Sequence, residues 1–195
     1  MMPRLHRSPL QRTFIPSGIG QPGRTPVRTR ISALAAFFAF LIVSVSAFAH
    51  QSKPAGVVAT AELKTIVPAG FFYRGQSATV QARNSAAIRT HDQKYIIAAL
   101  VDTSGYATDV KQKYQGLFIT EVKLKIEGSE LAPGQYGLGF VGDKFVVTDV
   151  GANNILSVSA KHDAELKRAV PLKIVKQGEE YRLYAGKNYV TLVVE

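Results

Sequence analysis

Apolar and polar residues alternate with a period of two along much of the chain after residue 60. The clearest example lies between residues 118 and 127, where one face of a predicted strand carries Phe118, Thr120, Val122, Leu124 and Ile126. Similar short runs are separated by turns that contain Gly, Asn or Asp, a pattern typical of antiparallel β-structure. Residues 61–195 are therefore predicted to form one all-β domain, a single antiparallel β-barrel or β-sandwich of about 8–10 strands.

The turns between these runs predict several hairpins. One joins residues 78–88 to residues 94–101, and another turns at residues 142–143. In the strand before that second turn, Gly137 and Gly139 alternate with apolar residues. Glycines in such a pattern indicate close approach of another backbone segment or a strong bend. Further strands are predicted at residues 63–67, 170–175, 181–185 and 189–194.

Two segments depart from the β pattern and predict short helical turns. Residues 108–115 carry Asp109 and Lys113 four residues apart and are followed by Gly116, which favours one or two turns of helix. Residues 163–168 begin with an acidic residue and end with basic ones, which matches the helix dipole.

A charge-free apolar run, Ile31–Ala49, precedes the β pattern. It follows Arg28 and Arg30 and ends in the small residues of Ala47-Phe48-Ala49, the arrangement that export machinery and its peptidase recognise. The run is predicted to be a cleavable signal that delivers the protein to the periplasm or the exterior. Its 19 residues are also enough to cross a bilayer as a helix, so an uncleaved N-terminal anchor is the alternative.

The segments on either side of the apolar run complete the predicted organisation. Residues 1–30 are basic and rich in proline, and they are predicted to be a disordered leader. Translation from Val27 instead would leave a signal of ordinary length. Residues 50–60 are predicted to be a flexible lead-in to the β domain at 61–195.

Charge and cysteine content exclude several functions. The net charge of the chain is +10, but residues 1–49 carry six arginines and no acidic residue. The remainder has 18 basic against 14 acidic side chains, interspersed along the chain, so no nucleic-acid partner is predicted. The chain has no cysteine, which excludes disulfides and a thiol nucleophile.

Aromatic residues supply the candidate ligand-binding site. A concentrated aromatic and basic group lies between Gly70 and Gly75, and two further tyrosines lie just before and within the predicted helical turn. Apolar walls with one charge suit a small amphipathic ligand. The alternative is a short strand that packs its rings into the core. The candidate residues are Phe71, Phe72, Tyr73, Arg74, Tyr106 and Tyr114.

Histidines supply the candidate metal and catalytic chemistry. Cleavage after Ala49 would make His50 the N-terminal residue, whose amine and ring chelate copper when a second histidine joins them. His91 and His162 are the only other candidates in the exported part, and their spacing imposes no metal geometry. No metal, cofactor or catalytic residue is therefore assigned.

The predicted function is that of an exported, non-enzymatic β domain that binds a small apolar ligand. Two alternatives stay open: an envelope-associated module that binds another protein, and a hydrolase or metal-dependent enzyme that uses His91 or His162. An open apolar interior would favour ligand binding. An exposed apolar patch on a filled core would favour a protein partner, whereas converging polar groups in a pocket would favour an enzyme.

Overall fold

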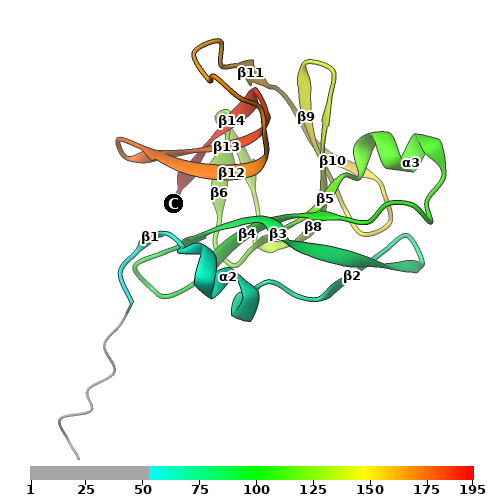
Figure 1. The fold of residues 1–195 in the computed structure, drawn as a ribbon, viewed down its shortest axis with the longest axis horizontal. Helices are drawn as coiled ribbons and strands as arrows, with labels where there is room; N and C mark the ends of the chain where they lie inside the picture. Colours follow the sequence, from blue (N-terminus) through cyan, green and yellow to red (C-terminus); the bar gives the residue numbers. More distant parts are fainter. Residues whose placement is uncertain (1–52) are drawn as a thin grey trace, which may run out of the picture. The chain divides into compact units, whose positions relative to one another are not determined.

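The computed structural model describes residues 53–195, in which two antiparallel sheets pack against each other (Figure 1). The predicted leader, the apolar run and His50 lie outside the described residues. The all-β prediction is confirmed. The described strands do not close into a barrel, so the two-sheet alternative is the one observed.

The larger sheet has eight strands, and β3 pairs with three others at different points along its length. The predicted hairpins at 78–101 and around residues 142–143 are both present in it. In spatial order the strands are β1 (Gly56–Val57), β3 (Gln76–Arg89), β4 (Tyr95–Val101), β5 (Gly116–Thr120), β8 (Gly134–Val141), β9 (Lys144–Thr148) and β10 (Asn154–Ser159), and β2 (Gly70–Tyr73) also pairs with β3.

The smaller sheet has six strands and contains the three predicted C-terminal runs. Its strands in spatial order are β12 (Val170–Gln177), β13 (Glu180–Gly186), β14 (Asn188–Val194), β6 (Leu124–Ile126) and β7 (Ser129–Leu131), and β11 (Lys161–His162) also pairs with β14. The described chain thus has 14 strands, more than the 8–10 predicted. Four of them span only two or three residues, which is too short to show a period of two.

The strand predicted between residues 118 and 127 is two strands in different sheets. The chain leaves β5 at Thr120, whose hydroxyl bonds the backbone of Val122, and enters β6 at Leu124. Phe118, Leu124 and Ile126 are nevertheless all fully buried in one core between the sheets. The alternation stays in phase because both strands bury the same face toward that core, so periodicity alone did not reveal the break.

A second core covers the outer face of the larger sheet. Two short helices, α2 (Thr60–Ile66) and α3 (Thr108–Lys113), contribute to it together with β2. Helix α3 confirms the helical turn predicted at 108–115. Its Val110 is buried, as are Tyr106 and Tyr114 on either side of the helix.

Two local predictions are wrong. Most of residues 63–67 belong to helix α2, which ends at Ile66, rather than to a strand, because this segment lies on the face of the larger sheet and buries Leu63 against it. Residues 163–168 form a turn rather than a helix. There the Asp163 side chain accepts hydrogen bonds from the backbone N–H groups of Glu165 and Leu166, and no helical ladder follows.

Within the predicted lead-in, the sheet already begins at β1. Gly56 and Val57 pair with the end of β3, and the N–H of Val58 donates to the carbonyl of Ala87. Val58 is buried in the second core. Ordered β-structure therefore starts before the predicted domain boundary at residue 61.

Candidate functional site

An open, uncharged cavity with a volume of about 430 Å³ lies between the two sheets. Strands of both sheets line it, because β12 of the smaller sheet lies beside β3 of the larger one. None of the side chains in its lining is charged. The lining residues are Gln81, Leu100, Val101, Thr103, Gln115, Phe140, Pro171, Ala185 and Gly186.

Hydrogen bonds hold two polar side chains of this cavity in fixed positions. The amide of Gln115 bonds the backbone of Phe140 twice: its Nε2 donates to the carbonyl at 2.9 Å, and its Oε1 accepts from the N–H at 3.0 Å. The Oε1 of Gln81 accepts from Asn84 at 2.7 Å. Leu100 and Phe140 continue into the core between the sheets. The cavity thus presents apolar walls with a few oriented amide groups, which is the usual composition of a small-molecule site.

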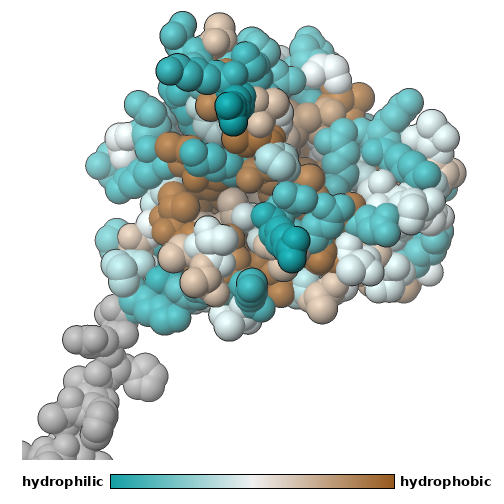
Figure 2. Space-filling view, viewed as in Figure 1, coloured by the Kyte–Doolittle hydropathy of each residue, from teal (hydrophilic) through white to brown (hydrophobic). Residues whose placement is uncertain are grey.

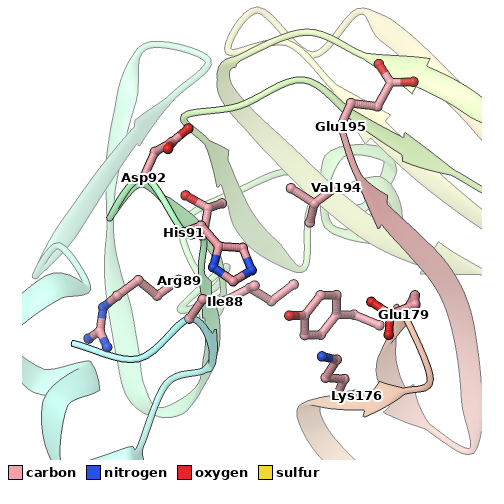
Figure 3. A pocket seen from close by; sticks show the side chains of 11 residues that line it. Ile88, Arg89, His91, Asp92, Lys176, Glu179, Val194 and Glu195 are labelled. Carbon is pink, nitrogen blue, oxygen red and sulfur yellow. The ribbon is translucent and has the colours of Figure 1, made fainter. Parts of the chain in front are cut away.

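A second cavity, of about 280 Å³, also lies between the two sheets, where the end of β3 faces the β12–β13 hairpin (Figure 3). Ile88 and Val194 are among its apolar lining residues, and Figure 2 shows apolar surface between β12 and the β3–β4 hairpin. In Figure 3 the His91 ring points into this cavity. Charged residues of both signs contribute to the lining: Arg89, Asp92, Lys176, Glu179 and Glu195.

Arg89 in that lining is anchored rather than free. Its side chain is only 4% exposed and bonds the carboxylate of Glu62, the carbonyl of Pro54 and the hydroxyl of Tyr95. The Arg89 guanidinium, and after it the Lys53 ammonium at 2.6 Å, hold the pKa of Glu62 below its usual range. These contacts tie β1 and α2 to the end of β3, so Arg89 stabilises one wall of the cavity.

The ion pair of Glu62 and Arg89 should make the stability of the protein depend on pH. The pKa of Glu62 is lower in the folded state than in the unfolded chain, so the stabilisation is complete above the ordinary glutamate pKa of 4.5. It is lost as the pH falls through the lower, folded-state pKa. The difference in unfolding free energy between the wild type and Glu62→Gln, measured by urea denaturation, should therefore shrink from pH 6 to pH 3. Glu165→Gln, at an exposed turn position, is the matched control for the loss of one carboxylate. A difference between the wild type and Glu62→Gln that stays constant over this pH range would contradict the assignment.

The predicted aromatic site is only partly brought together. Phe71, Tyr73, Tyr106 and Tyr114 meet in the second core, where the Tyr73 and Tyr114 rings stack with centroids 3.8 Å apart. Phe72 points away from this core and is 63% exposed. Arg74 follows at an exposed turn with a φ of 47°. None of these six residues lines the cavities described above, and their role in ligand binding stays a prediction.

The two candidate histidines lie in different surroundings. His91 lines the second cavity, whereas His162 lies on β11 with its Nδ1 2.9 Å from the Asn188 side-chain oxygen. A third cavity, lined by charged residues of the smaller sheet, contains the ion pair of Lys161 and Glu127 at 2.6 Å. Across residues 53–195, no group of three or more His, Asp or Glu side chains is arranged to hold a metal ion.

The lining of the uncharged cavity was missed because its residues come from separate parts of the chain. Gln81, Gln115, Phe140 and Pro171 share no local motif, and only the pairing of distant strands unites them. No helix in the described part of the chain is long and apolar enough to cross a membrane. Comparisons with protein-family models, curated proteins and solved structures find no match to this chain.

Proposed function

We propose that this protein is an exported, non-enzymatic domain that binds a small, uncharged and largely apolar ligand between its two sheets. The observation that carries the proposal is the cavity of about 430 Å³ whose lining contains no charged side chain. Its volume lies within the range of about 300–1,000 Å³ that is usual for small-molecule sites. The apolar run at 31–49 supports export.

The polar groups of the cavity indicate the charge and the functional groups of the ligand. A charged ligand would lose its hydration without gaining a partner of opposite charge, which is costly in an apolar cavity. Amide groups such as those of Gln81 and Gln115 favour hydroxyl or carbonyl groups on an otherwise apolar body. The second cavity lacks this selectivity because charged residues of both signs line it.

Native mass spectrometry of the full-length gene product, purified from an export host, tests the proposal. The expected spectrum shows a chain that begins at His50 and a fraction that retains one uncharged ligand per chain. In parallel, the uncharged probe N-phenyl-1-naphthylamine should bind one saturable site, whereas an anionic naphthalene sulfonate should bind it poorly.

A cavity-filling variant distinguishes this site from the rest of the surface. Ala185→Leu places a larger side chain in the cavity and should weaken binding of the uncharged probe about tenfold or more, equivalent to about 1.4 kcal/mol. Ala164→Leu makes the same change at an exposed turn and should bind the probe like the wild type. Equal probe affinity in the two variants, with both folded by circular dichroism, would refute the cavity as the site.

A further inference from the structure

Strand β10 forms an outer edge of the larger sheet, and its sequence differs from that of the other long edge strand. Within the described chain it pairs with β9 alone, so one side of its backbone has no strand partner. Its six residues, Asn154–Ser159, contain no charge, no proline and no glycine. By contrast, the long edge strand β12 of the smaller sheet carries Pro171 and two lysines.

This contrast indicates that the β10 edge pairs with a strand of another chain. Proteins protect exposed edges with lysine, proline or strong twist, because an open edge adds strands from other chains. β12 has two of these protections, whereas β10 has only an irregularity between Asn154 and Leu156 in its pairing with β9. From Leu156 to Ser159 the register with β9 is regular, so this stretch offers an uninterrupted backbone edge to another strand.

The side chains of β10 suit a symmetric partner. Leu156 and Val158 lie half-buried at the rim of the core between the sheets, whereas Ser157 and Ser159 are exposed on the other face. If two copies pair antiparallel about a twofold axis at Ser157, Leu156 of one copy lies opposite Val158 of the other. The same contact occurs again on the other side of the axis. Two half-exposed apolar pairs would then extend the core from one copy into the next.

Charge also favours a second copy over an unrelated chain. A twofold axis places equivalent residues opposite one another, so any charge near the centre of the strand would face its own copy. The absence of charge from β10 removes that repulsion, and Ser157 at the centre offers only a small hydroxyl. We propose that two copies of this protein associate through antiparallel β10–β10 pairing centred on Ser157, which joins their larger sheets into one continuous sheet.

Single cysteines test the pairing, because the protein has none of its own. Directly opposed residues of antiparallel strands lie with Cα atoms about 4.5–5.5 Å apart, within the range that a disulfide spans. In the protein purified from an export host, Ser157→Cys should form a disulfide-linked dimer under mild oxidation. Ser159→Cys on the same strand is the control: its two copies would lie about 14 Å apart, because four residues separate them along the strand. It should remain monomeric on a non-reducing gel.

Sedimentation velocity supplies the second readout. The wild type should show a monomer–dimer equilibrium, and Ser157→Lys and Ser157→Glu should each shift it at least tenfold toward monomer. An equal mixture of the two variants should recover the dimer, since opposite charges then face each other. Gln177→Lys, at the exposed end of the β12 edge, should behave like the wild type. A wild type that is monomeric at all concentrations, or a dimer that Ser157→Cys does not cross-link, would overturn the proposal.

Discussion

Gly139→Ala is expected to lower the free energy of unfolding by about 2–3 kcal/mol, the upper part of the usual range for overpacking a core. A Cβ atom on Gly139 would lie 2.3 Å from the carbonyl oxygen and 2.8 Å from the carbonyl carbon of Lys113. Both are backbone atoms at the end of α3, so no side-chain rotation can relieve the overlap. Either α3 must move away from β8, or β8 must bend.

Thermal and urea denaturation measure this change, and the melting temperature should fall by roughly 5–10 °C. Gly105→Ala is the matched control. Its Cβ would meet only the end of the Gln76 side chain, at 3.3 Å, and that side chain can rotate away. We expect Gly105→Ala to stay within about 0.5 kcal/mol of the wild type. If both variants lost the same stability, the contact between α3 and β8 would not be the cause.

Tyr114→Phe is expected to raise the free energy of unfolding by about 1–2 kcal/mol. Tyr114 is fully buried, and no hydrogen bond of normal geometry to its hydroxyl is found within the described chain. The Tyr106 hydroxyl, its polar neighbour, already donates to the carbonyls of Tyr73 and Gln76. Burial raises the pKa of this hydroxyl well above its usual range, which reflects the same removal from water. Phenylalanine keeps the ring that stacks on Tyr73 and removes the polar atom that costs free energy when buried alone.

Tyr73→Phe, which changes the other ring of this stack, is expected to lower the free energy of unfolding. The Tyr73 hydroxyl lies 2.6 Å from the hydroxyl of Thr148, which is itself fully buried. Removal of the tyrosine oxygen leaves Thr148 without this partner, so we expect a loss of about 1–3 kcal/mol. Urea denaturation of both variants at pH 7 measures the pair of effects. A destabilised Tyr114→Phe would show that the Tyr114 hydroxyl has a hydrogen-bond partner in solution.

Local features of the chain were predicted well. The hairpin of β3 and β4 follows from two β-rich runs around a short turn, and helix α3 follows from its charge pair and the glycine after it. The expected close approach of another backbone segment is confirmed at Gly139, which leaves space for α3. At Gly137 the close atoms belong instead to side chains, those of Tyr73, Tyr114 and Thr148. These features depend on neighbouring residues or on the absence of a side chain, and both are visible in sequence.

The cavity proposed as the binding site was not predicted from the sequence. The aromatic group drew attention because its residues are adjacent in sequence, but four of its members pack into a core. The cavity between the sheets joins residues from Gln81 to Gly186, and it depends on how β12 lies beside β3. The period of two in β3 and in β12 does not indicate that these strands lie beside each other, because each strand shows the same alternation whichever partner covers its face.

The sequence by itself determined that this chain forms antiparallel β-structure, where most strands run and which of their faces are buried, because a period of two is a property of each strand alone. The tertiary structure decided that the strands divide into two sheets, that the chain crosses between them after Thr120, and that an uncharged cavity opens where the sheets meet. It also left β10 at an edge. These outcomes depend on which distant strands pair, and the free energy of that choice comes from burial shared between segments rather than from any one of them.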